Sequence, residues 1–194
     1  MFGDFSRYAT ILPAEHQPAL KRDLTRIPDF SWLLSDPHPS LNRLQGDLIK
    51  DFPTVFLDDS ATPWSRNFTV MLLNNTCDLP DDRLDFVTAA PVIDFQKYLD
   101  FERPRRTAES LRAYADSIRR NDKTELFYLP KFDEFQNGGL VLLHRVCSVS
   151  AQVYRQALTA QKRVASFTQT GFYFLLMKMT THIARAETAE VVRG

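Results

Sequence analysis

The sequence predicts an α+β fold: a small, strongly bent, mostly antiparallel β-barrel with helices before, within and after it. Two observations lead to this prediction. Apolar runs of strand length cluster in the middle of the 194-residue chain, and runs with helical spacing lie near both ends. We therefore expect an N-terminal helical arm over residues 1–45, a barrel over 46–149, and a C-terminal helical segment over 150–194 packed on the barrel.

The clearest strands flank a polar elbow at residues 74–78. Residues 68–73 form a continuous apolar run with β-branched members, which is typical of a strand buried on both faces. A second apolar run covers 86–93. The sequence therefore predicts two strands side by side, with the elbow at one edge of the barrel. Further strands are expected, on similar patterns, at 47–56 and 126–129, and residues 140–143 with 146–149 predict either one strand with a bulge or a strand that enters a loop.

Three regions have helical patterns. In residues 14–27, apolar side chains share one face and Pro28 follows directly. Residues 103–120 predict a helix inserted into the barrel, with Pro104 in its first turn. Arginines and acidic residues interleave on the polar face of this helix. That pattern favours a solvated face, with an RNA-binding surface as the alternative.

The C-terminal region is expected to be helical from about residue 150 to 186. Ser166 and Gln169 have the spacing of a capping box, so a second helix is expected to begin there. Residues 171–179 are apolar nearly all round, and such a helix is either buried centrally or covered by a partner. We therefore expect a protein partner or a homo-oligomer formed through this C-terminal helix.

Charge and cysteine content exclude some classes of protein. The formal net charge of +0 argues against binding nucleic acid by coating phosphates, although a local basic patch stays possible. Two cysteines are too few for a disulfide scaffold, and we expect reduced thiols in the cytoplasm. The N-terminus lacks the pattern of a signal peptide, and the longest apolar stretch, 172–177, is too short to cross a membrane.

The elbow and its surroundings contain the candidate chemistry. Cys77 is a candidate nucleophile, with His144 as its base and Asp78 orienting the histidine. The alternative is structural, with the polar side chains bonded to turn amides and the cysteine filling an apolar gap. The carboxylate beside Cys77 disfavours a reactive thiolate, which favours the structural interpretation. Arg66 is a candidate phosphate ligand or simply an exposed loop arginine.

Binding candidates at the same elbow are Asn74, Asn75 and Thr76, whose polar side chains would lie at the rim of the barrel. No cysteine or histidine pair has zinc-finger spacing, and the sequence contains no metalloprotease helix motif, no phosphate-binding glycine loop and no serine-hydrolase elbow. We therefore predict neither a metal site nor a cofactor.

The order of landmarks resembles the PemK/MazF-type toxins, which are bacterial endoribonucleases with an SH3-like barrel. The resemblance covers roughly residues 46–149: Gly46-Asp47-Leu48 opens a strand, Arg66 precedes VMLLNN, and a later strand ends in Ala90-Pro91-Val92. It implies an SH3-like barrel, with Arg66 in the place of the family's catalytic arginine. The family's catalytic threonine corresponds to Ile93 here, which has no hydroxyl.

Two functions follow as hypotheses. The first is a non-catalytic protein-interaction module, in a bacterial defence or toxin–antitoxin setting that only the resemblance implies. The missing threonine, the neutral charge and the apolar C-terminal helix favour it. The alternative is an endoribonuclease-like toxin with an altered site built from Arg66, Cys77, Asp78 and His144.

Overall fold

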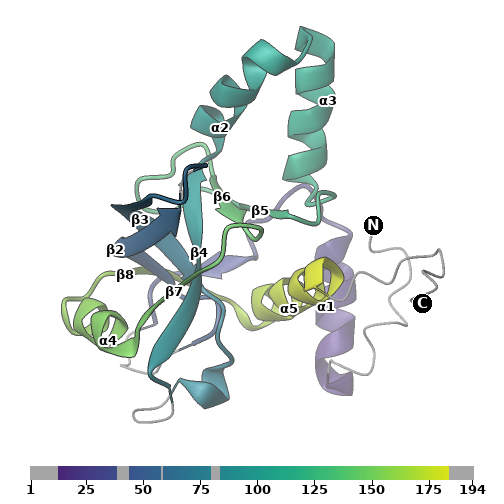
Figure 1. Cartoon of the computed structure of the whole chain (residues 1–194). Helices are drawn as coiled ribbons and strands as arrows, with labels where there is room; N and C mark the ends of the chain where they lie inside the picture. The colour runs from purple at the N-terminus through teal and green to yellow at the C-terminus, as the bar shows by residue number, and fades with distance from the viewer. Residues whose placement is uncertain (1–12, 39–43, 58, 80–83, 184–194) are drawn as a thin grey trace, which may run out of the picture.

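The computed structural model describes residues 13–38, 44–57, 59–79 and 84–183. It shows an α+β protein built on an eight-stranded sheet in which every pair of neighbours is antiparallel. Helices α2 and α3 project from one end of the sheet as an arm, and α1 and α5 lie together at its side (Figure 1). The α+β class predicted from the sequence is confirmed.

The sheet is open in the described part of the chain. Its two terminal strands, β1 and β5, do not pair with each other, and β7 (Cys147–Ser150) pairs with one end of β4. A closed barrel is therefore not confirmed. The strands in sheet order are β1 (Leu34–Ser35), β8 (Arg163–Phe167), β2 (Leu48–Leu57), β3 (Pro63–Leu72), β4 (Phe86–Asp94), β6 (Gly139–Leu142) and β5 (Leu126–Leu129).

The two apolar runs around the elbow pair as predicted. Strands β3 and β4 are antiparallel, with Thr69 opposite Val92 and Leu72 opposite Ala89. Strand β3 begins at Pro63, earlier than its apolar pattern indicated. The added residues are exposed and pair only with β2, so they form a projecting hairpin without the apolar signal of a buried strand.

The entry to β2 is fixed by Gly46 and Asp47. Gly46 has a φ of +91°, and a Cβ there would lie 2.6 Å from the Phe167 side chain. The fully buried Asp47 carboxylate lies 3.0 Å from Nε of Arg163 and accepts a 2.9 Å hydrogen bond from the Ser166 hydroxyl. Burial raises the pKa of Asp47, and the Arg163 charge opposes that shift. This buried ion pair joins β2 to β8.

The N-terminal helix forms close to its expected position, as a 3-10 turn η2 (Ala14–His16) followed by α1 (Gln17–Leu24). The helix expected over 103–120 is found in part, as α3 (Ala108–Arg119). It starts later than expected, after helix α2 (Phe95–Glu102) and a 3-10 turn η4 (Arg103–Arg105), and the chain breaks before it.

The reason for this break is local. Arg106 has extended backbone angles, φ −137° and ψ 149°, and the next side chain, Thr107, accepts a hydrogen bond from the Ser110 amide to start α3. Asp94 caps α2 in the same way by accepting from the Lys97 amide. The arm is therefore a bent pair of helices, each with its own N-cap.

The C-terminal region contains two helices, as expected: α4 (Ala151–Thr159) and α5 (Gln169–Ile183). Strand β8 separates them, where a helical pattern was expected. Gln161, with a φ of 54°, lies in the connection after α4. Ser166 does not cap a helix, because its hydroxyl bonds to Asp47 in the sheet. Thr168 instead accepts from the Gly171 amide at the start of α5.

Helix α5 is buried within its own chain. Phe174, Leu175 and Met177 have no exposed surface and join the main core with Leu20 of α1 and Phe127 of β5. Its apolar surface is therefore explained without a partner, and the expected interaction through this helix stays a prediction. No helix in the described ranges is both long and apolar enough to cross a bilayer.

Lys178 of α5 is also fully buried. Its ammonium group donates hydrogen bonds to the backbone carbonyls of Asn121 and Lys123, in the connection between α3 and β5. Burial lowers the pKa of Lys178 to about 7, and the nearby charges of Glu125 and Asp122 oppose that shift. The lysine ties the base of the arm to the core.

Candidate nucleic-acid interface

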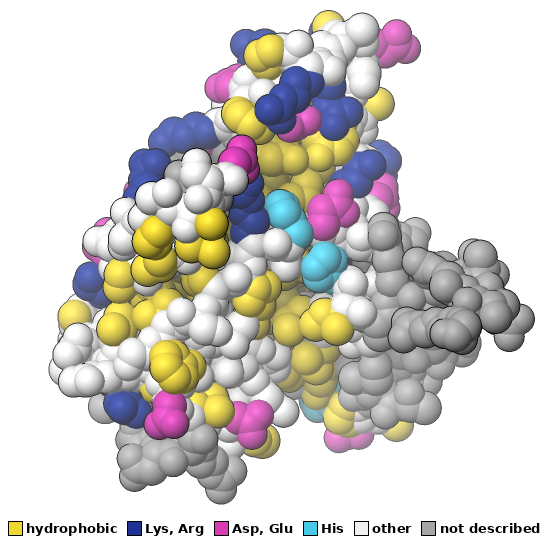
Figure 2. All heavy atoms as spheres, in the orientation of Figure 1, with side chains coloured by type: hydrophobic (Ala, Val, Ile, Leu, Met, Phe, Trp, Pro, Cys, Tyr) yellow, Lys and Arg dark blue, Asp and Glu magenta, His cyan; other side chains and the backbone are white. Residues whose placement is uncertain are grey.

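A groove of about 700 Å³ lies between the arm and the sheet. Figure 2 shows it as a hollow below the arm, with hydrophobic side chains on its floor and basic side chains at its edges. Its walls come from β3, the end of β4, helix α2, the segment before β6 and the turn after β6. Residues with polar or aromatic side chains in this lining are Arg66, Asn67, Phe68, Thr69, Asp94, Lys97, Tyr98, Phe101, Glu102, Glu134, Phe135, His144 and Arg145.

Three basic side chains line the groove from different elements. Arg66 comes from β3, Lys97 from α2 and Arg145 from the turn after β6, and all three are exposed. Within the described ranges, none of them forms an ion pair with a carboxylate. The guanidinium of Arg66 lies 5.5 Å from the centre of the Phe68 ring. These cations are thus available to an anionic ligand.

The three acidic residues of the lining are each engaged. Asp94 caps α2, and Glu102 lies 3.4 Å from Arg105 and 3.0 Å from Arg106. Glu134 accepts a 3.4 Å hydrogen bond from the Thr69 hydroxyl. Because Glu102 is nearly buried under two arginines, its charge is largely compensated before any ligand arrives.

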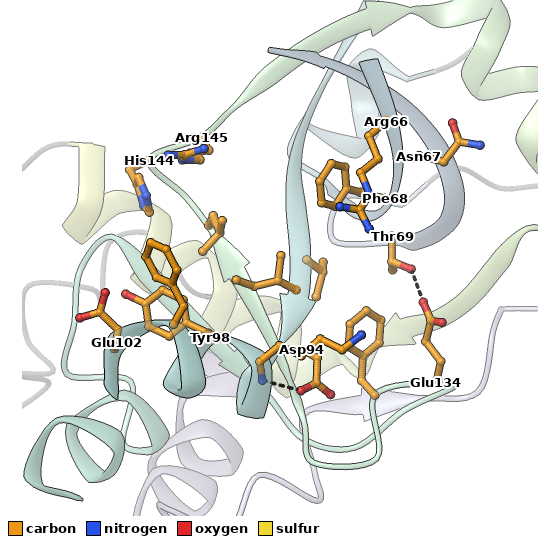
Figure 3. Close-up of a pocket in the computed structure, with 16 residues that line it drawn as sticks. Arg66, Asn67, Phe68, Thr69, Asp94, Tyr98, Glu102, Glu134, His144 and Arg145 are labelled. Carbon is orange, nitrogen blue, oxygen red and sulfur yellow. Dashed lines mark hydrogen bonds between the residues drawn. The ribbon is translucent and has the colours of Figure 1, made fainter. Parts of the chain in front are cut away.

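His144 lies at the edge of the groove beside Arg145, across from Arg66 and Phe68 (Figure 3). Its Nδ1 lies 3.3 Å from the backbone carbonyl of Glu125. When Nδ1 carries the proton and donates to that carbonyl, Nε2 carries the lone pair. His144 can then accept a proton from a ligand in the groove, which is the chemistry of a general base.

Aromatic rings add a second kind of surface. Tyr98 and Phe101 lie three residues apart on α2, so they share the helix face that borders the groove. The Tyr98 hydroxyl is 2.9 Å from the Tyr114 hydroxyl of α3. Burial and this hydrogen bond raise the pKa of Tyr98, so its hydroxyl stays neutral. Phe101 is 60% exposed, which is unusual for a side chain of its size.

The elbow has a structural role instead. The side chain of Asn74 accepts from the Thr88 amide, Asn75 accepts from the Cys77 amide, and Thr76 accepts from the Gln45 amide. The short 3-10 turn η3 (Thr76–Asp78) thus has its polar side chains bonded to the backbone of the chain itself. These three residues hold β3, β4 and the segment before β2 in register.

Cys77 and Asp78 do not reach the groove. The elbow follows the C-terminal end of β3, whereas Arg66 lies near the start of that strand, and the six residue steps from Arg66 to Leu72 span about 20 Å. Both cysteines are free thiols, with Cys77 exposed and Cys147 buried. Burial raises the pKa of Cys147, which keeps that thiol protonated.

The structure thus brings together two of the four candidate catalytic residues, Arg66 and His144, and separates them from Cys77 and Asp78. Sequence reasoning missed Lys97, Tyr98 and Phe101 because it did not identify α2 as a helix. Their spacing on one helical face was the available signal. Arg145 was visible only as the neighbour of His144.

The comparisons with known proteins give no relative: no family model, no curated protein and no solved structure matches this chain. Among the described residues, no group of three or more histidine, cysteine, aspartate and glutamate side chains has the arrangement of a metal site. The chemistry of the groove itself is therefore the basis for a functional proposal.

Proposed function

We propose that this protein binds single-stranded RNA in the groove between the arm and the sheet. The observation that supports this proposal is the set of basic side chains Arg66, Lys97 and Arg145, which line the groove from three separate elements and form no ion pair with any described carboxylate. Phosphate oxygens are the ligands that such cations prefer. A chain of phosphates can bridge several cations, whereas a single small anion contacts fewer.

Aromatic rings that line the groove favour a single strand over a duplex. Bases in a duplex are stacked on each other and unavailable, whereas unpaired bases stack on aromatic side chains. The groove offers Phe68, Tyr98 and Phe101 beside the cations. The neutral net charge of the chain fits a local site of this kind better than a broad phosphate-coating surface.

Cleavage of the bound strand is a second candidate function, supported by His144 and Arg66 in the same groove. In this reaction the 2′-oxygen bonds to the adjacent phosphorus and the bond to the 5′-oxygen breaks. Nε2 of His144 accepts the 2′-hydroxyl proton, the 5′-oxygen takes a proton from water, and Arg66 stabilises the charge on the phosphoryl oxygens. The products are a 2′,3′-cyclic phosphate and a 5′-hydroxyl.

This mechanism extends the proposed kinship with PemK/MazF-type toxins. The bent sheet is then an opened relative of the SH3-like barrel, and Arg66 keeps the role of the family's arginine. His144 takes over proton transfer, because Ile93 has no hydroxyl. A role in a bacterial defence or toxin–antitoxin system belongs to the same proposal.

Fluorescence anisotropy with a labelled 12-nucleotide single-stranded RNA tests binding. We expect the triple variant Arg66→Ala/Lys97→Ala/Arg145→Ala to lose about 100-fold or more in affinity at low salt, because three phosphate contacts are removed. The matched control is Lys21→Ala/Arg22→Ala/Arg155→Ala, which removes the same charge from α1 and α4. Equal losses in the two variants, or no binding by the wild type, would refute the proposal.

Gel electrophoresis of the same RNA tests cleavage. His144→Ala is expected to abolish the cyclic-phosphate product while changing RNA affinity by less than about threefold, since the histidine acts on the proton. An oligodeoxynucleotide of the same base sequence lacks the attacking 2′-hydroxyl and is expected to stay intact. Reactions with and without EDTA report any need for a divalent cation. Full activity in His144→Ala would remove that residue from the mechanism.

A protein partner is a separate proposal, supported by a different surface. Val55 and Leu57 of β2 are 57% and 68% exposed, and Trp64 of β3 is 38% exposed, all on the projecting β2–β3 hairpin. Val55 and Leu57 lie two residues apart on one face of the hairpin, whereas Trp64 packs on Phe56 at the other face. Exposed apolar pairs such as Val55 and Leu57 are typical of an interaction surface. Light scattering of the wild type and of Leu57→Asp tests self-association through this hairpin. A monomeric wild type would exclude such self-association.

A further inference from the structure

The arm holds an aromatic side chain in a position that its own folding does not require. Phe101 is 60% exposed at the groove, while Phe95 and Leu99 of the same helix α2 are buried in the core beneath it. Burying Phe101 would stabilise the fold, and the exposed position forgoes that gain. The ring is therefore available to a ligand.

Arg105 covers part of this ring. Its guanidinium carbon lies 4.2 Å from the centre of the Phe101 ring, and its Nη1 lies 3.4 Å from Oε1 of Glu102. The 3-10 turn η4 continues directly from α2, and Arg105 lies four residues after Phe101, so the two side chains come together on one side of the arm. Arg105 covers one face of the phenyl ring, and the side chain is otherwise open to the groove.

A connected set of contacts holds the neighbouring ring as well. Glu102 also pairs with Arg106 at 3.0 Å, and the Arg106 guanidinium lies 3.7 Å from the centre of the Tyr114 ring. The Tyr114 hydroxyl contacts the Tyr98 hydroxyl at 2.9 Å, which returns the network to α2. Fixing the rings before a ligand arrives reduces the conformational entropy lost on binding.

We propose that the arm provides a base-stacking subsite, in which the open surface of Phe101, backed by Arg105, receives one unpaired nucleobase of the RNA. This inference rests on the proposed RNA binding and specifies which part of the ligand the arm contacts. Nearby Lys97, His144 and Arg145 line the same groove and supply partners for the adjoining phosphates. A purine overlaps the ring more than a pyrimidine, so the subsite prefers adenine over uracil.

Three labelled 12-nucleotide probes test the subsite by anisotropy: oligo(A), oligo(U) and an abasic ribose-phosphate strand of the same length. The wild type is expected to bind oligo(A) more tightly than oligo(U), and the abasic strand most weakly. Phe101→Ala should weaken oligo(A) binding by roughly 5- to 150-fold, the range for loss of one stacked base, and change abasic binding by less than twofold.

Two further variants complete the test. Phe101→Trp should keep the preference for oligo(A), and its fluorescence should be quenched by oligo(A) and unaffected by the abasic strand. The matched control is Phe86→Ala, since Phe86 of β4 is 62% exposed and does not line the groove. This control should leave all three affinities unchanged.

The results separate failure of the subsite from failure of RNA binding. Equal wild-type affinity for oligo(A) and the abasic strand, or equal weakening of both by Phe101→Ala, overturns the stacking subsite and leaves phosphate binding intact. No binding of any probe by the wild type at low salt overturns the proposed function itself, and the subsite with it.

Discussion

The elbow and the groove lie toward opposite ends of strand β3, and both are rich in polar side chains. In the elbow, Asn74, Asn75 and Thr76 are bonded to backbone amides of the chain itself. In the groove, Arg66 has no carboxylate partner among the described residues. The difference shows that polar residues at high density can serve the fold, whereas the exposed cations of the groove stay available to an anion.

The largest expected change in folding stability is at the elbow end of the sheet. Asp47→Ala should lower the free energy of unfolding by about 3–5 kcal/mol, because it leaves the Arg163 charge buried without its partner. Urea denaturation measures the change. The double variant Asp47→Leu/Arg163→Met removes both charges and is expected to be more stable than the single variant. A single variant as stable as the wild type would contradict a structural role for this pair.

Lys178 is a fully buried polar group outside both the elbow and the groove. Its pKa is about 7 in the folded protein and near 10.5 when exposed, so above pH 7 the unfolded chain binds more protons than the folded one. The contribution of Lys178 to stability should therefore rise by about 2 kcal/mol from about pH 7 to about pH 9. Urea denaturation across this range should show a steeper rise in the wild type than in Lys178→Met. Parallel curves would contradict a lowered pKa.

A smaller effect is expected within the elbow. Asn75→Ala removes the side chain that accepts from the Cys77 amide at the start of η3, and it should cost about 1 kcal/mol of stability. RNA affinity should not change, because the elbow lies outside the groove. Thermal melting and anisotropy measure the two quantities. Weaker RNA binding with unchanged stability would reverse the roles assigned to the two regions.

Removing a single cation from the groove should give the smallest change, which is a change in the free energy of RNA binding. Arg145→Ala is expected to weaken RNA binding about fivefold and to reduce the slope of log affinity against log salt by about 0.7, the value for one phosphate contact on a single strand. Its stability should stay within about 0.5 kcal/mol of the wild type, because the side chain is exposed. An unchanged salt slope would exclude Arg145 as a phosphate ligand.

The sequence predicted those parts of the fold that depend on local apolar patterns. Strands β3 and β4 were found because most of residues 68–73 and 86–93 are apolar and buried or half-buried. Strand β8 was missed because its sequence contains Arg163 and Ser166. Their burial depends on Asp47, a partner more than a hundred positions away. Such pairing is a tertiary effect that no local pattern reports.

The candidate site was predicted only in part, because long-range pairing also decides which residues meet there. Arg66 and His144 were identified by residue type, but they were grouped with Cys77 and Asp78, which are close to Arg66 only along the chain. Which end of β3 meets the turn after β6 depends on strand order. Strand order in turn follows from long-range pairs such as Val92 with Val141. The α2 face was missed because only Phe95 and Leu99 mark its buried side.

Strand β2 has one neighbour close in sequence and one far away. Leu48 pairs with Met71 of β3 and also with Ala165 of β8. A growing chain on the ribosome can form the first pairing early, but the other edge of β2 waits until β8 leaves the exit tunnel. A chain cut before residue 163 therefore exposes an unpaired strand edge, and we expect such fragments to aggregate or to be degraded.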